Sequence, residues 1–393
     1  MKVLTGLWIL LQVFIGYNLF MPFLLYFIYL LKRNKHKKEI CINETEGDFA
    51  IIVTAYEQTT LLPELVNFIL KINYSNYLVY IVADNCDISN LHFSGKKVFV
   101  LRPEETLASN TKSHFYAISH FKRAHEFLTI IDSDNLVHPE YLNELNKQFH
   151  AGYEAVQGIR AAKNLNTTYA CLDAARDIYY HFYDGKILFN AGSSAALAGS
   201  GMAFTTDLYR KSLEHSDITG AGFDKVLQYQ IVNKGVRIAF SETAIVYDQK
   251  TTDTDQLVKQ RARWINTWFK YFKYGFQLLW KGLIHFNRNQ FLFGIILLRP
   301  PLFIFLILSG LFMIINLWIA PVVSIIWFIS ILLFAISFFI ALQKSDTDKR
   351  IYNSLSNIPK FIFYQVLSLL KVRKANKHSV ATQHFYEKTT ERR

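Results

Sequence analysis

The sequence predicts an α/β domain with a Rossmann-like, mostly parallel sheet, joined to a membrane by an N-terminal helix and a C-terminal helical hairpin. Three observations predict it. Strand-like and helix-like segments alternate between residues 49 and 131, which is typical of a parallel sheet. Asp132 and Asp134 directly follow the apolar run 127–131. Long uncharged apolar segments stand near both ends of the chain.

The composition favours a membrane-associated protein. The 393 residues are 51% hydrophobic and 16% aromatic, with a formal net charge of +12. A basic chain suits nucleic acid, an anionic membrane surface or a phosphate-bearing substrate. Because the positive charges stand mostly beside apolar segments, we expect a lipid bilayer and no nucleic acid as partner. The three cysteines lie far apart, which indicates neither a disulfide framework nor a zinc site.

The N-terminal segment, residues 1–38, is predicted to be a membrane anchor with a basic flank. Residues 4–31 carry no charge and exceed the roughly 20 residues that span a bilayer. No cleavage site of small residues follows, so the anchor is expected to stay in place. The basic run 32–38 predicts a bacterial-type cell membrane topology with the N-terminus outside and the next domain in the cytoplasm.

Residues 47–253 are predicted to form the α/β domain. Its expected strands are 49–54, 78–83, 97–101, 127–131, 155–159, 236–240 and 244–247, and its expected helices are 59–71, 109–121, 167–183 and one that ends at Gly235. Asp84, Asp132 and Asp134 follow strands, so one crevice at the carboxyl edge of the sheet is expected to hold all three. Paired carboxylates there suit Mg²⁺ or Mn²⁺. The alternative is that these acids only end a strand and cap the next turn.

Two further features stand in the second half of the domain. Gly199 and Gly201 permit a close approach of the backbone to a ligand, although a G-x-G is also common in tight turns. Asp224 lies in the first turn of a predicted helix, where an acid often does no more than stabilise the helix dipole.

Residues 254–300 are amphipathic, aromatic and basic. Such a stretch either stacks on nucleic-acid bases or lies in the membrane interface, and its place next to spanning segments favours interfacial helices. Two apolar spans, 302–320 and 322–342, predict a transmembrane hairpin within 301–343, which makes three spans. Residues 344–393 are predicted to be cytoplasmic, with an interfacial helix at 358–370 and a basic tail.

Taken in order, Asp84, Asp132-x-Asp134, Gly199-Ser200-Gly201, Asp224 and Gln260-x-x-Arg263-Trp264 resemble the motifs of the family 2 glycosyltransferases. The chain is most similar to the membrane-bound branch with cellulose, chitin, hyaluronan and poly-N-acetylglucosamine synthases. The resemblance covers about Phe49 to Phe272 and the flanking spans.

The resemblance implies a GT-A fold and an inverting, metal-dependent hexosyltransferase that uses a UDP-sugar. Asp224 matches the catalytic base, and Asp132 and Asp134 match the motif for the metal and the diphosphate. The donor nucleotide is then expected at Ala55, Tyr56, Glu57, Asp84 and Asp132. The acceptor and the diphosphate are expected at Gly199, Ser200, Gly201, Gln260, Arg263 and Trp264.

Two departures from the family pattern bear on function. Phe223 stands at the position before the base, where family members usually have an acid. This change concerns the acceptor side, so it leaves the identity of the acceptor open. The first strand ends Thr54-Ala55-Tyr56-Glu57-Gln58 instead of Pro-Ala-Tyr-Asn-Glu. The expected function is transfer from a UDP-sugar, UDP-N-acetylglucosamine or UDP-glucose, to a polysaccharide or lipid-linked acceptor at the cytoplasmic face. The alternative is a catalytically silent nucleotide-sugar-binding subunit of a polysaccharide synthase.

The resemblance leaves several properties open: the sugar, the linkage, the acceptor, and processive against single addition. The Gln260-x-x-Arg263-Trp264 motif favours processive synthesis. Three spans are few for a self-contained translocation channel, so an oligomer or a secretion partner is expected.

Overall fold

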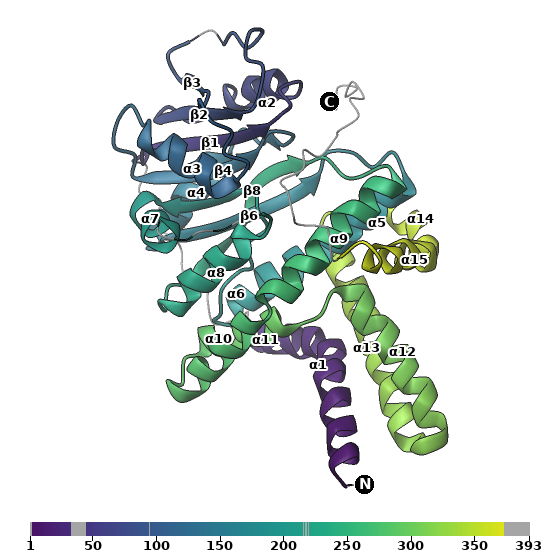
Figure 1. Ribbon diagram of the computed structural model, residues 1–393. Coiled ribbons are helices and arrows are strands. Elements are labelled where there is room, and N and C mark those ends of the chain that lie inside the picture. Colours follow the sequence, from purple (N-terminus) through teal and green to yellow (C-terminus); the bar gives the residue numbers. More distant parts are fainter. Residues whose placement is uncertain are drawn as a thin grey trace.

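A mixed eight-stranded sheet forms the centre of the domain, and three long helices leave it on one side (Figure 1). The structure is a computed structural model that describes residues 2–32, 45–93, 95–214, 216, 218 and 220–372. The strand order is β3-β2-β1-β4-β7-β6-β8-β5. The strands are β1 Phe49–Tyr56, β2 Tyr77–Asp84, β3 Val98–Leu101, β4 Phe127–Asp132, β5 Leu136–Val137, β6 Ala155–Ala162, β7 Met202–Thr205 and β8 Ile238–Asp248.

The first half of the sheet, β3-β2-β1-β4, is parallel throughout, as predicted. Alternate residues of β1 point to opposite faces. Ile51 and Val53 pack in one core cluster with α2 (Leu62–Ile69) and α4 (Tyr141–His150), while Ala50 and Ile52 pack in the other. That second face is covered by α3 (Asn110–Ser119), α7 (Thr206–Leu213) and α8 (Phe223–Asn233).

The second half of the sheet agrees with the prediction where β6 and β8 pair parallel, and differs from it in the strands that join this pair to its neighbours. β7 pairs antiparallel with both β4 and β6, and β5 pairs antiparallel with β8. β7 was not predicted because its residues follow the G-x-G and resemble a turn. β8 is one strand instead of two, since it continues through the exposed Glu242 and Thr243. The elements β5, α4 and α7 were also absent from the prediction.

The predicted helix 167–183 is α5 (Thr168–Tyr180), which continues into a π-helix, η2 (His181–Ile187), and the short α6 (Leu188–Asn190). This stretch joins the sheet to the long apolar helix at residues 321–344. The Tyr183 hydroxyl donates to the Ser337 carbonyl at 2.9 Å, and the Tyr179 ring lies 5.6 Å from that of Phe334.

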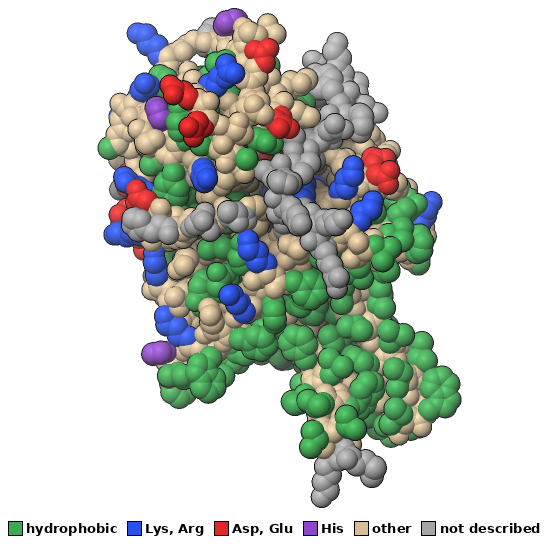
Figure 2. Space-filling view, viewed as in Figure 1, with side chains coloured by type: hydrophobic (Ala, Val, Ile, Leu, Met, Phe, Trp, Pro, Cys, Tyr) green, Lys and Arg blue, Asp and Glu red, His purple; other side chains and the backbone are tan. Residues whose placement is uncertain are grey.

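Three helices are long and apolar enough to cross a membrane: α1 (Lys2–Lys32), α12 (Leu302–Ile319) and α13 (Pro321–Lys344). Gln12 of α1 joins the hairpin, because its side-chain oxygen accepts from Trp327 at 2.9 Å and from Asn316 at 2.7 Å. Apolar side chains cover these helices in Figure 2. Most of the basic flank, from residue 33 to 38, and the tail from residue 373 lie outside the described residues.

The predicted stretch 254–300 contains α9 (Thr254–Tyr271), α10 (Lys273–Ile284) and α11 (Arg288–Leu298). α10 and α11 form a tight hairpin, since a Cβ added at Gly282 would lie 2.4 Å from the Phe291 nitrogen. Near the C-terminus, α14 (Lys349–Ser354) and the 3₁₀ turn Leu355–Asn357 precede α15 (Ile358–Leu369), which lies where a helix was predicted.

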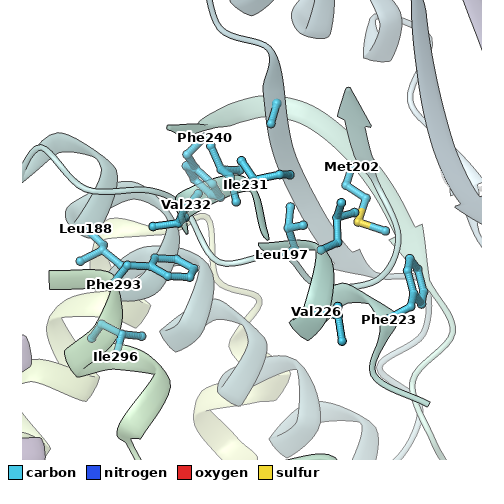
Figure 3. Close-up of a cluster of buried hydrophobic side chains, with 14 of the residues drawn as sticks. Leu188, Leu197, Met202, Phe223, Val226, Ile231, Val232, Phe240, Phe293 and Ile296 are labelled. Atoms are coloured by element: carbon cyan, nitrogen blue, oxygen red, sulfur yellow. The ribbon is translucent and has the colours of Figure 1, made fainter. Parts of the chain in front are cut away.

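The helix α8 is fixed by a cluster of buried apolar side chains (Figure 3). Phe223 and Val226 lie beside Met202 of β7, and Ile231 and Val232 lie toward α11. Because α8 is held between the sheet and α11, its first turn has a defined place at the edge of the sheet.

Candidate active site

The carboxyl edge of the parallel strands brings the first predicted site residues together. Tyr56 pairs in register with Asp84, and Thr54 pairs with Asp132. Asp84 and Asp132 therefore lie on the two strands that flank β1, at one edge of the sheet. Glu57, just past β1, is exposed, and its backbone N–H donates to the Asp84 carbonyl at 3.1 Å.

Backbone donors hold the Asp84 carboxylate. Its Oδ1 accepts from the Leu107 N–H at 2.9 Å and its Oδ2 from the Ala108 N–H at 2.7 Å. Three non-glycine residues with positive φ surround it: Glu57 at 60°, Asn85 at 53° and Ala108 at 47°. A left-handed conformation is costly for such residues, and strained backbone of this kind clusters at ligand sites.

The Ser200 side chain holds the D-x-D end of β4 through two hydrogen bonds. The Asp132 N–H donates to Ser200 Oγ at 3.1 Å, and that hydroxyl donates to Asn135 Oδ1 at 2.5 Å. Asn135 in turn donates from Nδ2 to Asp134 Oδ1 at 3.0 Å. The Ser200 side chain is thus buried under the D-x-D loop, whereas a Cβ at Gly199 (φ 88°) would meet open space.

The electrostatics at Asp132 favour a cation. Burial, followed by the charge of Asp134, raises the pKa of Asp132 to about 7, and Asp248 and Asp224 add to the effect. Two repelling carboxylates at a strand end fit a divalent cation, which would relieve their repulsion. No cluster of three His, Cys, Asp or Glu side chains suited to a metal occurs among the described residues. Asp132 and Asp134 are only two carboxylates, so a cation bound by them would need further ligands, such as the phosphates of a substrate.

Asp224 lies in the first turn of α8, half-buried, with Lys225 Nζ 3.5 Å from its carboxylate. Its negative charge acts on Asp132, so the two groups share one region. Phe223 is buried in the core, and its ring packs edge-on against His114 at 5.1 Å. The sequence had suggested an effect of Phe223 on the acceptor, but its side chain points away from solvent.

The Gln260-x-x-Arg263-Trp264 motif lies on α9. The Thr251 hydroxyl donates to Gln260 Oε1 at 3.4 Å, and burial lowers the pKa of Arg263. Trp264 remains 41% exposed. Two guanidinium groups lie near its ring, those of Arg176 at 4.3 Å and Arg261 at 4.0 Å from the ring centre.

Sequence reasoning missed the charged residues between these parts. Asp248, at the end of β8, accepts from Asn135 Nδ2 at 3.2 Å and from Arg160 at 2.8 Å. Burial raises its pKa, but Arg160 and Lys250 outweigh this and hold the pKa at about 2. Asp248 follows an apolar strand as Asp132 does, so the same strand-end pattern could have identified it. Arg160 and Lys250 have no local signal.

The sheet, with carboxylates at the ends of β2, β4 and β8, belongs to a domain of the glycosyltransferase class. The family model described as "Glycosyltransferase like family 2" matches residues 47–267, more than half of the 393-residue chain. The chain belongs to this family and is a transferase.

Among solved structures, the chain is similar to the mannosyltransferase PcManGT from Pyrobaculum calidifontis, in complex with GDP-Man and Mn²⁺. The TM-score is 0.52 at 13% identity, over 92% of this chain and 98% of that one. S. aureus TarS 1-349 matches at 16% identity with a TM-score of 0.40, over 84% and 90% of the two chains, which is too distant to support an argument. A comparison with curated proteins gave no match.

Proposed function

We propose that the chain is an inverting glycosyltransferase. It transfers a sugar from a UDP-sugar, UDP-N-acetylglucosamine or UDP-glucose, to a polysaccharide or lipid-linked acceptor. The observation that carries this is the placement of Asp84 and Asp132 at the ends of the two strands that flank β1, in a domain that matches the family 2 glycosyltransferases. An inverting displacement requires a carboxylate base and a departing diphosphate on opposite sides of one carbon.

In this proposal the base is Asp224, which takes the proton from the acceptor hydroxyl. The position of α8 is constrained by its packing against α9, because a Cβ at Gly222 would lie 2.5 Å from Thr267 Cγ2. Asp84, together with the backbone at Ala55, Tyr56 and Glu57, binds the nucleotide. Arg263 binds the diphosphate, and the exposed part of Trp264 contacts the acceptor sugar.

Asp132 and Asp134 would hold Mg²⁺ or Mn²⁺. When bound, such an ion supplies charge neutralisation for the departing diphosphate. The support is the mutual repulsion of the two carboxylates and the presence of Mn²⁺ with GDP-Man in the PcManGT structure. Asn135 orients the Asp134 carboxylate, and Ser200 holds the backbone of Asp132 and the side chain of Asn135.

The proposed site faces the cytoplasm, with the N-terminus outside. The support is the basic run 32–38 directly after the first candidate span, since such runs favour the cytoplasmic side, together with the location of all three candidate spans on one side of the domain (Figure 1). α10 is proposed to lie in the membrane interface, because Phe276, Trp280 and Phe286 near it are 50%, 67% and 95% exposed. Aromatic side chains of this kind favour the interface between lipid and water.

The silent-subunit alternative rested on Phe223. Phe223 is buried against His114, and the carboxylate of Asp224, the proposed base, is retained next to it in the first turn of α8. The favoured form of the activity is processive synthesis, and product length separates it from single addition.

The experiment is nucleotide release by the purified protein in nanodiscs, across UDP-sugars and GDP-mannose, with Mg²⁺ or Mn²⁺ and oligosaccharide or lipid-linked acceptors. We expect release with one donor and a loss of about 100- to 10,000-fold in Asp224→Asn. Asp207→Asn is the matched control, because Asp207 is an acid in the first turn of α7 and is exposed. Equal activity of Asp224→Asn and the control would refute Asp224 as the base.

A further inference from the structure

A chain of buried ion pairs runs between the D-x-D end of the sheet and the tryptophan of α9. We call it the charge ladder and define it by six residues: Asp173, Arg176 and Asp177 of α5, Asp248, Lys250, and Arg261 of α9. None of them was singled out by the sequence, and the proposed function above assigns none of them a role.

Lys250 is the central residue of the ladder. Its side chain is among the largest fully buried ones in the described part of the chain, and the residue is 2% exposed. Its ammonium lies 2.8 Å from Asp248 Oδ2 and 2.5 Å from Asp177 Oδ2. Lys250 thereby joins the end of β8 to α5.

At one end, the ladder reaches the D-x-D. Asp248 accepts from Asn135 at 3.2 Å, and Asn135 donates to Asp134 at 3.0 Å. One side chain therefore separates Asp248 from the D-x-D carboxylates.

At the other end, the ladder reaches Trp264. Arg176 bridges Asp177 at 2.5 Å and Asp173 at 3.0 Å, and Asp173 also pairs with Arg261. The three α5 residues have i, i+3 and i+4 spacing and share one helix face. The guanidiniums of Arg176 and Arg261 lie 4.3 Å and 4.0 Å from the Trp264 ring centre. Such cation–π contacts restrict the orientation of an indole that is otherwise partly in solvent.

Stability alone is a poor explanation of this arrangement. Buried ion pairs lose much of their attraction to desolvation, and apolar side chains of similar size often hold two elements together as well. What an ion-pair network adds is directional geometry. Here it fixes three separate elements, β8, α5 and α9, to one another.

We propose that the charge ladder positions Trp264 relative to the D-x-D end of β4. Lys250 and Arg176 are then positioning residues that set where the acceptor lies against the bound donor. This inference rests on the proposed function. Because α5 also packs against the spanning helix α13 through Tyr179, the ladder gives the crevice a fixed place above the membrane.

The first test is Arg176→Met, which removes one of the two guanidinium groups that contact Trp264, keeps that of Arg261, and leaves Lys250 between Asp177 and Asp248. We expect the KM for cello- or chito-oligosaccharide acceptors to rise about tenfold. The Kd for UDP with Mn²⁺ should stay within twofold. The matched control is Lys163→Met, which removes the partly buried Lys163–Glu64 pair (2.8 Å), a side-chain contact that involves no residue of α5 or α9 and leaves the backbone hydrogen bond from Lys163 to Asp248 in place.

The second test interrupts the ladder without leaving an unpaired charge. Lys250→Met alone leaves two buried carboxylates facing each other, so it is combined with Asp177→Asn. In the double variant Asp248 keeps Arg160 and Arg176 keeps Asp173. We expect a folded protein with a raised acceptor KM. An acceptor KM at the wild-type value in both Arg176→Met and the double variant would overturn the proposal.

A third readout does not need turnover. Amide hydrogen exchange over Thr254–Tyr271 of the ligand-free protein in nanodiscs should be faster in both ladder variants and unchanged in Lys163→Met. A wild-type protein that turns over no donor would count against the proposed function, while the exchange data still decide the ladder. Equal exchange in α9 in all variants would overturn the ladder as a positioning device.

Discussion

The two halves of the sheet hold their carboxylates by different means. In the parallel half, Asp84 is held by two backbone N–H groups at 2.9 and 2.7 Å, with no cationic side chain in hydrogen-bond contact among the described residues. In the mixed half, Asp248 is held by Arg160 and Lys250, each at 2.8 Å. Asp132 lies where the halves meet, and the charges of three acids, Asp134, Asp248 and Asp224, act on it.

The difference follows from what each half is proposed to bind. A nucleotide suits an invariant backbone cradle, because hydrogen bonds from the main chain keep their place without mobile charges. A diphosphate and an incoming hydroxyl suit a charged environment, in which fixed side chains act on developing charge. The parallel half would thus recognise the donor, and the mixed half would take part in the reaction.

The largest expected effect on turnover is at Asp132, where the two halves of the sheet meet. Asp132→Asn should lower turnover by about 100- to 1000-fold, because it removes one of the two carboxylates that would hold the divalent cation at the departing diphosphate. The same variant should stabilise the ligand-free protein at pH 7 to 8. Burial and Asp134 raise the pKa of Asp132 from 3.8 to about 7, so the ionised carboxylate is unfavourable in the folded state.

The sign follows from proton binding. Between pH 4 and 7 the folded protein binds a proton at Asp132 that the unfolded chain has lost, so stability falls as the pH rises through this range. The amide of the Asp132→Asn variant would not titrate. The free energy of unfolding of this variant at pH 7.5 should therefore exceed that of the wild type by on the order of 1 kcal/mol or more. Thermal unfolding from pH 5 to 8 in metal-free buffer measures it. A lower Tm for the variant at pH 7.5 would contradict this account.

The second prediction tests whether Phe223, in the mixed half, is a core residue or a residue that faces the acceptor. Phe223→Glu restores the acid that the family usually has, but it buries a carboxylate beside His114, whose pKa burial lowers to about 3. We expect destabilisation by about 3 kcal/mol or more and no gain in activity. Phe223→Leu, an apolar control, should cost only about 1 kcal/mol. Thermal unfolding and nucleotide release measure both, and a stable, more active Glu variant would show that the side chain faces the acceptor.

The contrast between the halves also explains what the sequence could predict. β1, β2 and β4 are short apolar runs with acids at their ends, so local pattern alone indicated the strands and the positions of Asp84, Asp132 and Asp134. The three candidate spans followed from length and hydropathy in the same way. Such features depend on residues that are close in the sequence.

The mixed half depends on contacts between distant residues. β7 has four residues after a G-x-G, and only its pairing with β4 and β6 makes it a strand. Lys250 has no helical or strand pattern around it, and its role depends on Asp177, which is 73 residues away. Phe223 stands at the position of an acid, and its burial is visible only from its packing against His114. Sequence reasoning therefore described the parallel half of the sheet better than the mixed half.

A third, smaller effect tests the backbone cradle. Asp84→Asn keeps the shape of the side chain but replaces one acceptor oxygen with a donor, which would face the N–H of Leu107 or Ala108. We expect the affinity for UDP to fall about tenfold and the protein to lose about 1–3 kcal/mol of stability. Calorimetric titration with UDP measures the first. Asp87→Asn, an exposed acid just past the same strand, is the control and should bind UDP as the wild type does.

The smallest effect concerns the strain in that cradle. Ala108 has φ 47°, which glycine adopts without cost, so Ala108→Gly should relieve strain while it adds entropy to the unfolded chain. These contributions are each about 0.5–1 kcal/mol and should nearly cancel in Tm. Ala151→Gly, at φ −74°, has only the entropic cost and should lower Tm by a few degrees. Because the looser Ala108 N–H would hold Asp84 less firmly, UDP affinity should fall two- to threefold in Ala108→Gly alone. Unchanged UDP affinity with a raised Tm would mean that the strained conformation of Ala108 does not contribute to nucleotide binding. Binding of the donor in the parallel half would then depend on the Asp84 side chain and not on the conformation of the loop at Ala108.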